Sequence, residues 1–446
     1  AGLVEFDGAA MRDAVLRVAR GALSVAGPVR AVGITAQRAS TIVWDTRTGV
    51  PVAPGLSWQD LRTVGDCMRL RSEHGLVFAP NQTATKLTWL TANVEAARSP
   101  HARAGTVDTW VAAVLSDFAV HATDSSNAAV TGLADHASLS KHEWSTSVLE
   151  TLNIDAQLLP RIVPTMSVIG EATALPGAPP IMAMVGDQQA SLVGQGGIVA
   201  GAAKATFGTG GMLDIYAGTT TPTHLARTKG GTFPIVVYSQ GTTLHWGAEA
   251  IMLTAGSNVE WLVNDMGLIP DAQSSDAMAA SVASSDGVMY VPALIGMGTP
   301  HWDYGARGTL LGLTRGTTKA HVVRAVLEGV AHRGADLLEA SEIDTGLRVE
   351  RLRVDGGMSR NAVFAQALAN ATGRPIDISR DTEATTLGAG FLAGVTAGVW
   401  DNLAQTAALV QPLRTVEPTA APLRAQWHEA VRRARGWIPE LSALDF

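Results

Sequence analysis

Segments patterned like β-strands alternate with segments patterned like α-helices along almost the whole chain. Apolar residues recur at helical spacing over residues 9–23, and short apolar runs at 29–35 and 41–45 predict strands. Residues 46–50 contain turn residues, which predict a hairpin after the second of these strands. Such alternation is typical of α/β proteins, in which helices cover a sheet, and it predicts that fold class.

The second half of the chain continues the alternation. A buried strand is predicted at 181–185, and a hairpin with glycines at its tip is predicted at 202–218. A long helix is expected at 320–340, then a strand within 347–357 and a helix over 361–372. The α/β pattern therefore covers both halves.

The segment with the least regular pattern is 194–203, where small residues cluster. We place a domain boundary there, which divides the chain into domains at 1–196 and 197–446. Each half contains strands that run into glycine-bearing turns and then helices. We therefore expect two similar α/β halves around a cleft, in agreement with a length that suits two or three domains.

Composition excludes several classes of protein. Hydrophobic residues make up 46% of the chain and charged residues 16%, which is the composition of a globular protein with ample core. The net charge of −7 argues against a broad basic face for nucleic acid. No apolar run is long enough to span a membrane, and residues 1–8 do not resemble a secretory signal. Cys67 stands alone and cannot form an internal disulfide, so we expect a cytoplasmic protein.

Asp187 follows the predicted buried strand at 181–185, with Gln188 and Gln189 directly after it. Ligands of α/β proteins gather at the carboxyl ends of strands, where an acid can act as a general base or bind a metal. The alternative is that Asp187 only caps the helix that follows. Local pattern by itself leaves both interpretations open.

Two glycine-bearing turns are candidates for binding a phosphorylated or flat ligand. Residues 206–211 place three glycines and a threonine at a hairpin tip, where backbone N–H groups can form an anion-binding nest. Residues 354–361 place two adjacent glycines before a predicted helix, whose N-terminus favours anions. Ordinary tight turns explain either segment equally well. The chain contains neither a P-loop motif nor a GxSxG nucleophile elbow.

Polar side chains also gather at 33–41, just past a predicted strand, and at 56–63. The residues concerned are Gln37, Arg38, Trp58, Gln59, Asp60 and Arg62. Amides, guanidinium and carboxylate groups beside an aromatic ring suit a polyhydroxylated ligand, since each hydroxyl needs donors and acceptors. A surface network of caps and salt bridges is the alternative.

Taken in order, these stretches resemble the FGGY carbohydrate kinase family, and most closely its glycerol kinase branch. Any one block would be a weak match, but their order runs through nearly the whole chain. The matching blocks are 33–49, 56–63, 85–90, 107–111, 123–128, 186–195, 206–211, 299–308, 308–328, 354–361 and 385–394.

The resemblance implies an actin-like ATPase fold of two ribonuclease-H-like domains around a cleft, with the sugar or polyol in the first domain and ATP in the second. By this resemblance Asp187 is the general base and a ligand of Mg²⁺. Arg38, Trp58, Asn81 and Gln188 would contact the substrate.

The resemblance also assigns the nucleotide site. The residues expected there are Gly208, Thr209 and Gly210 at the ATP phosphates, and Gly356, Gly357 and Asn361 against the adenosine. Phosphoryl transfer depends mainly on positioning and charge neutralisation, which donors and Mg²⁺ supply.

The chain departs from the family pattern at its start. Residues 1–8 resemble the segment that follows the family's opening hairpin, and no Asp-x-Gly-Thr phosphate turn occurs in the sequence. Two interpretations follow: the chain is truncated, or it is a relative that lacks part of its active site. Loss of the first strands would expose sheet edges in the first domain.

The presumed glycerol pocket departs as well. Ala39 stands where glycerol kinases carry Glu, Asn81 where they carry Tyr, and Met212 where they carry an aromatic residue. A carboxylate acceptor and two aromatic walls are thus replaced. We expect a substrate larger than glycerol, either a longer polyol or a ketose.

We therefore predict an ATP- and Mg²⁺-dependent kinase that phosphorylates a hydroxyl of a polyol or sugar. The alternatives are a catalytically impaired ligand-binding relative, glycerol kinase itself, and an actin-like ATPase with a protein partner. No nucleic-acid or membrane partner is expected, and a homo-oligomer, either dimer or tetramer, is.

Overall fold

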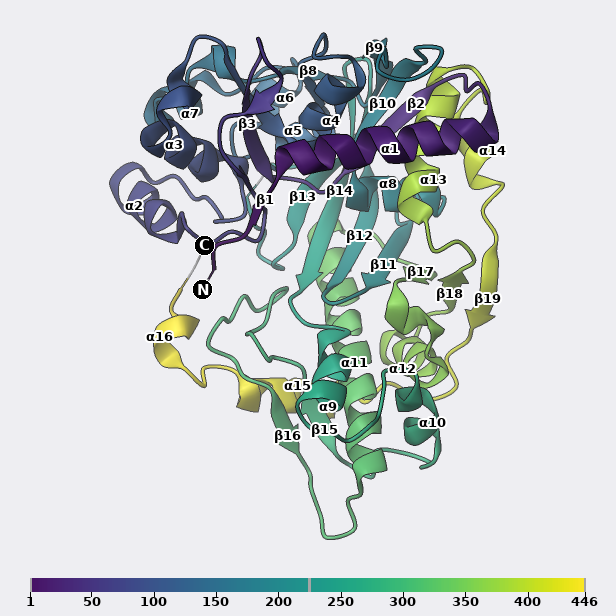
Figure 1. Ribbon diagram of the computed structural model, residues 1–446. Coiled ribbons are helices and arrows are strands. Elements are labelled where there is room, and N and C mark those ends of the chain that lie inside the picture. Colours follow the sequence, from purple (N-terminus) through teal and green to yellow (C-terminus); the bar gives the residue numbers. More distant parts are fainter. Residues whose placement is uncertain (1, 224–225, 445–446) are drawn as a thin grey trace.

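The computed structural model describes residues 2–223 and 226–444, which form helices packed around one large mixed sheet and a smaller one (Figure 1). In spatial order the strands of the large sheet are β19 (Pro412–Val416), β18 (Ile376–Ser379), β17 (Leu352–Asp355), β11 (Ala203–Phe207), β12 (Gly211–Gly218), β14 (Thr243–Met252), β13 (Phe233–Gln240), β9 (Met166–Glu171), β10 (Pro180–Gly186) and β2 (Val32–Ala36). The α/β class is confirmed.

The large sheet has a part from each half of the chain. Strands β2 and β10 pair in parallel, β9 pairs antiparallel with β10, and β11, β17 and β18 are mutually parallel. A single residue pair, Gln240 with Met166, joins the two parts. The expected two halves are thus connected through one continuous sheet, at whose end β2 has β10 as its only partner among the described strands.

The smaller sheet belongs to the first half. It contains β1 (Glu5–Phe6), β5 (Gly55–Leu56), β3 (Thr41–Asp45), β4 (Val50–Pro51) and β6 (Ala102–Thr106). Around it lie α1 (Gly8–Ala26), α2 (Val64–His74), α3 (Thr83–Asn93), η1 (Glu95–Arg98), α4 (Val107–Leu115), α5 (Ser125–Ala129), α6 (His136–Leu139), α7 (Thr146–Leu152) and η2 (Ala156–Leu158), with the strand pair β7 (Ala122–Asp124) and β8 (Arg161–Val163).

The second half is built around α11 (Lys319–Thr345), which lies along the lower strands in Figure 1. Apolar side chains of α11 pack with β11, β12, β14 and α12 (Ala362–Thr372) in one buried cluster. The other elements are α9 (Ser257–Asn264), α10 (Ser274–Ala280), β15 (Met289–Val291), β16 (Thr309–Leu311), η3 (Gly357–Arg360), α14 (Leu403–Ala407), α15 (Arg424–Ala434) and α16 (Pro439–Ser442).

Helix α13 (Ala384–Thr396) comes from the second half but packs against the first. It crosses α8 (Asp187–Gly194) so closely that a Cβ at Gly388 would lie 1.8 Å from the Ala190 carbonyl oxygen. A Cβ at Gly194 would lie 1.9 Å from the carbonyl oxygen of Ala384. Any side chain at these two positions would clash, so only glycine allows the crossing. As a result α8, which begins with Asp187, packs against α13, which lies nearly 200 residues further along the chain.

Most elements predicted from the sequence are present. The strand at 41–45, the hairpin turn after it and the hairpin at 202–218 are confirmed. The helix expected at 320–340 is longer and extends to Thr345, whereas the strand expected within 347–357 covers only Leu352–Asp355. In the described part of the chain, no helix combines the length and apolarity needed to cross a membrane.

Candidate active site

Asp187 lies where β10 ends and α8 begins. Strand β10 is buried almost throughout. Asp187 follows its carboxyl end, where the chain leaves the sheet, and about a third of the aspartate side chain is exposed. The N-cap of α8 is Gly186, and Asp187 Oδ1 accepts the N–H of Gln188 at 2.8 Å. The capping interpretation is therefore wrong, since Gly186 is the N-cap and no side chain caps α8, although Asp187 Oδ1 orients against the first turn. The second carboxylate oxygen makes no hydrogen bond with a described residue.

Arg38 brings a cation to this carboxylate. It lies between β2 and β3, with Nε 3.7 Å from Asp187 Oδ1, and its Nη2 donates to the Glu249 carboxylate on β14. Burial by itself would lower the pKa of Arg38, but Glu249 and Asp187 outweigh it and raise the pKa. Nη1 makes no hydrogen bond within the described residues, so one end of the guanidinium remains free for a ligand.

Glu249 belongs to a row of charged residues that crosses neighbouring strands. It pairs across the sheet with Asp214 on β12, which in turn pairs with Lys204 on β11. Burial raises the pKa of Glu249, Arg38 opposes the shift, and Asp214 adds to it. The sequence predicted the hairpin at 202–218 but no element at 243–252, and neither Glu249 nor Lys204 was predicted as a site residue. Charged residues inside otherwise apolar strands were the available signal.

The other residues predicted to contact a substrate meet near Arg38. The backbone N–H of Trp58 donates to Ser40 Oγ at 2.9 Å, and the residue is 37% exposed. Thr83 Oγ1 at the start of α3 donates to the carbonyl of Ala39 at 3.2 Å, which brings exposed Asn81 to the same region. Trp58, Asn81 and Arg38 thus come from three segments that the fold places together.

Asp60 and Arg62 form a salt bridge, as the structural alternative predicted, but the pair is buried and not at the surface. Arg62 donates from Nε and Nη2 to the Asp60 carboxylate at 2.8 Å and also reaches Glu5, while its guanidinium lies 4.6 Å from the centre of the Trp89 ring. Asp60 is fully buried and accepts the backbone N–H of Val4. Both side chains are used in holding the first strand and are not free for a substrate.

The turn at 208–210 is held by the segment that leads into α9. Gly256 N–H donates to the Gly208 carbonyl, and Ala255 N–H donates to the Thr209 carbonyl, each at 2.8 Å. The backbone N–H groups of residues 208–210 make no hydrogen bond with other described residues. Anchored carbonyls with free N–H groups form a site at which an anion can be bound.

The turn at 354–361 is shaped by close packing. Gly356 has φ of 85°, and a Cβ there would lie 2.4 Å from the Phe207 carbonyl oxygen, whereas the Cβ direction of Gly357 is open. Asn361 caps α12 through Phe364 N–H at 2.8 Å and donates to Ser275 Oγ at 3.0 Å. Its side chain is therefore already engaged, so only its backbone and the open face at Gly357 are left for a nucleotide.

Asp355, which precedes these glycines, joins the two halves. Its Oδ2 accepts from Gln195 Nε2 at 2.7 Å and from Ser191 Oγ at 3.2 Å, both at or near the end of α8. The buried Oδ1 has no hydrogen-bond partner among the described residues. An acid at the carboxyl end of β17 was visible in the sequence but received no role.

For Mg²⁺, the residues near Asp187 offer a limited set of ligands. Mg²⁺ is commonly bound through one or two carboxylates together with phosphate oxygens and water, and Asp187 fits that need. In the described ranges, a compact trio of possible metal ligands occurs elsewhere, at Asp336, Glu339 and His428. Arg424 already lies among these three, which makes that trio a salt-bridge cluster.

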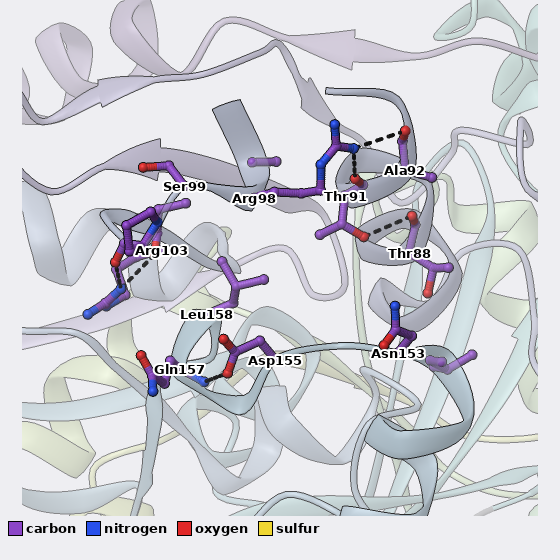
Figure 2. A pocket seen from close by; sticks show the side chains of 14 residues that line it. Thr88, Thr91, Ala92, Arg98, Ser99, Arg103, Asn153, Asp155, Gln157 and Leu158 are labelled. Carbon is purple, nitrogen blue, oxygen red and sulfur yellow. Dashed lines mark hydrogen bonds between the residues drawn. The ribbon is translucent and has the colours of Figure 1, made fainter. Parts of the chain in front are cut away.

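A hollow of about 580 Å³ opens in the first half of the chain, away from these residues (Figure 2). It lies between the end of α3, η1, β6 and η2. Figure 2 shows the guanidinium groups of Arg98 and Arg103 turned toward backbone carbonyls, with Arg98 Nη1 2.7 Å from the Thr91 oxygen. No residue predicted for the substrate or nucleotide site lines this hollow.

Lys86 gives a pH-dependent prediction for the region around Asn81. The lysine is fully buried, and its Nζ donates to the Asn81 carbonyl at 2.8 Å. Burial lowers its pKa from 10.5 to about 7, against the opposing charge of Asp60. The unfolded chain therefore binds more protons between pH 7 and 10.5, and stability contributed by this site rises with pH over that window.

We expect Lys86→Met to remove this rise, as measured by urea unfolding at several pH values between about 7 and 10. The matched control is Lys141→Met, which removes an exposed lysine and should keep the parent's pH profile. A Lys86→Met profile that rises as steeply as the parent's would show that Lys86 titrates normally.

Both halves of the chain match a known protein family. Residues 4–194 match the N-terminal domain of the FGGY family of carbohydrate kinases, and residues 203–397 match its C-terminal domain. A glycerol kinase of Bordetella parapertussis is 40% identical, with 98% of this chain and 90% of that protein aligned. A glycerol kinase of Trichlorobacter lovleyi is 38% identical, with coverage of 98% and 91%.

Solved structures agree with this. Plasmodium falciparum glycerol kinase with ADP aligns with a TM-score of 0.89 and 27% identity, covering 97% of this chain and 90% of that one. A Brucella ovis protein described as a xyloylose kinase aligns with a TM-score of 0.82 and 26% identity, covering 100% and 92%. The resemblance predicted from the ordered sequence blocks and the actin-like fold that it implied are confirmed.

Proposed function

Because the chain belongs to the FGGY family of carbohydrate kinases, we propose that it transfers the terminal phosphoryl group of ATP to a hydroxyl of a polyol or sugar larger than glycerol. The observation that carries this proposal is the placement of Asp187. A partly exposed carboxylate stands at the end of a buried strand, 3.7 Å from the Arg38 guanidinium and beside a glutamine amide.

In the proposed reaction Asp187 accepts the proton of the attacking hydroxyl. A general base must be ionised and within hydrogen-bond reach of the proton that it removes. The Arg38 cation lies 3.7 Å from Asp187 Oδ1, and the N–H of Gln188 fixes the orientation of the carboxylate through the same oxygen. The free oxygen Oδ2 is the atom that we assign to the hydroxyl proton.

The substrate hydroxyls are assigned to Arg38, Trp58, Asn81 and Gln188. Arg38 Nη1 is a free donor, and Trp58 offers an exposed apolar ring against which the carbon chain can lie. Asn81 supplies both donor and acceptor groups. This set provides polar contacts for several hydroxyls at once, as a sugar or longer polyol requires.

For the nucleotide, we assign the free N–H groups of Gly208, Thr209 and Gly210 to the phosphates, and the open face at Gly357 to the adenosine. Asp187 is the carboxylate available to Mg²⁺, which supplies neutralisation of phosphate charge when bound. The family-model matches end at 194 and begin again at 203, which supports a substrate domain at 1–196 and a nucleotide domain at 197–446.

Substrate choice is tested with a panel of glycerol, tetritols, pentitols and ketopentoses. We expect kcat/KM to be highest for a substrate longer than three carbons, because Ala39 removes a carboxylate acceptor and Asn81 and Met212 replace aromatic walls. The variant Ala39→Glu/Asn81→Tyr should raise kcat/KM for glycerol relative to the longer substrates by at least about tenfold, since a site that pairs each hydroxyl discriminates strongly.

Glycerol itself is the second candidate substrate, since the similar proteins of Bordetella parapertussis and Trichlorobacter lovleyi are glycerol kinases. A parent protein that uses glycerol better than every longer polyol and ketose would favour this candidate. ADP release without any acceptor would instead favour an ATPase, and no turnover at all would favour a ligand-binding relative.

A further inference from the structure

Lys204 is completely buried beneath Gln188. Its Nζ donates to Gln188 Oε1 at 2.5 Å and to Thr206 Oγ1 at 3.1 Å, and lies 2.9 Å from Asp214 Oδ2. An ammonium group carries three donors. Two of its protons are donated to Gln188 and Thr206, and the ammonium lies against the Asp214 carboxylate, so the lysine is held in one place.

The contact with Lys204 decides how the Gln188 amide is oriented. A lysine ammonium can only donate, so the amide oxygen must face Nζ and the amide NH₂ must face away. Gln188 Nε2 makes no hydrogen bond within the described residues, and the side chain is half-buried. Gln188 therefore presents donors, and not an acceptor, on its free side.

Asp214 holds the lysine from the opposite side. The two residues face each other across β11 and β12, and both side chains are 0% exposed. Neither oxygen of Asp214 accepts a hydrogen bond from a described residue, so its attraction to Lys204 is essentially ionic. A buried carboxylate without hydrogen bonds is costly unless a cation lies beside it, which makes each member of this pair dependent on the other.

The pair also lies in one network with the assigned base. Lys204 contacts Gln188, whose neighbour Asp187 faces Arg38. Arg38 pairs with Glu249, which lies opposite Asp214 on the neighbouring strand. Three of these residues come from before residue 197 and three from after it. Gln188 is thus held from the second half of the chain while it is attached to the first.

We propose that Lys204 and Asp214 are positioning residues that lock Gln188 as a hydrogen-bond donor to the substrate. The substrate atom opposite Gln188 must then be an acceptor, which means a hydroxyl or carbonyl oxygen of the polyol or sugar. This inference rests on the proposed role of Gln188 in substrate binding and adds the two residues that set the direction of its amide.

The test replaces the pair as a unit, with Lys204→Met/Asp214→Leu. A single replacement would leave one charge buried and unpaired, whereas apolar residues of similar size are often tolerated in place of a buried ion pair. We expect KM for the best substrate of the panel to rise about tenfold, the effect of one oriented hydrogen bond. KM for ATP should stay within about twofold.

Gln188→Ala provides the second arm. The triple variant combines Gln188→Ala with Lys204→Met/Asp214→Leu. If Lys204 acts through Gln188, KM of the triple variant should be no higher than KM of whichever of these two variants has the higher value, because both changes remove the same contact. Multiplied effects, of about a hundredfold together, would overturn the proposal. The control is Arg333→Met, which removes a buried cation of the second half but leaves its partner Asp336 paired with Arg424, and it should leave KM for the substrate unchanged.

A readout that does not need turnover is the Gln188 side-chain amide signal in protein labelled with ¹⁵N-glutamine. It should be assigned by its loss in Gln188→Ala, and its chemical shift should move in Lys204→Met/Asp214→Leu, because the ammonium no longer donates to the amide oxygen. An unchanged chemical shift would show that Lys204 does not hold the amide. Failure of every panel substrate would overturn the proposed function, whereas the amide signal would still decide the positioning claim.

Discussion

Asp187→Asn is expected to lower kcat by about 10²–10⁴-fold, the usual contribution of general base catalysis. Asparagine has nearly the same shape, and its oxygen can still accept the Gln188 N–H that Asp187 Oδ1 accepts at 2.8 Å. The variant loses the charge that faces Arg38 and the ability to take a proton. The measurement is ADP release with the best substrate of the panel, together with the midpoint of thermal unfolding.

A matched control is Asp377→Asn, which changes a mostly buried aspartate on β18 that pairs with Arg351. It should keep kcat near the parent value although it loses a salt bridge. If folded Asp187→Asn protein works at the parent rate, Asp187 is not the base and has only a structural role at the start of α8.

Gly356→Ala is expected to reduce the free energy of unfolding by about 2–5 kcal/mol, from a strained backbone and overpacking together. The residue has φ of 85°, and the added Cβ would lie within 2.8 Å of three backbone atoms of Phe207. Those atoms belong to β11, the strand paired with β17, so neither partner can move away without breaking the sheet. Urea unfolding measures the effect.

The neighbouring Gly357 provides the contrast. No described atom lies within 4 Å of a Cβ placed there, so Gly357→Ala should change stability by no more than about 0.5 kcal/mol. Gly357→Val should nevertheless weaken binding of a non-hydrolysable ATP analogue in calorimetry, because its side chain would occupy the space assigned to the adenosine. Unchanged nucleotide affinity would leave both glycines with a structural role only, and equal stability losses at both positions would contradict the packing argument for Gly356.

Much of the fold could be predicted because its signals are local. Apolar spacing identified α1 and α11, and the turn residues after β3 and between β11 and β12 identified both hairpins. The end of a buried strand likewise pointed to Asp187, since polar residues after such a strand lie at the edge of the sheet.

The candidate site was predictable only in part, because many of its contacts depend on strand register. Glu249 contacts Arg38, which is 211 residues away in the sequence, and no local pattern connects them. For Asp60 and Arg62, the sequence suggested a ligand site that the structure does not support. Their composition suited a polyhydroxylated ligand, but the fold uses them in a salt-bridge network with Glu5.

The sequence by itself determined the order of strands and helices, the glycine-bearing turns, the family and the acid at the end of β10, because each depends on residues close together in the chain or on the order of short blocks. Only the tertiary structure decided that Lys204 faces Asp214 and holds Gln188, and that α13 crosses α8 at two glycines. Cross-strand register and helix crossing bring together residues that are distant in sequence, and their geometry follows from the packing of the whole core rather than from any segment of it.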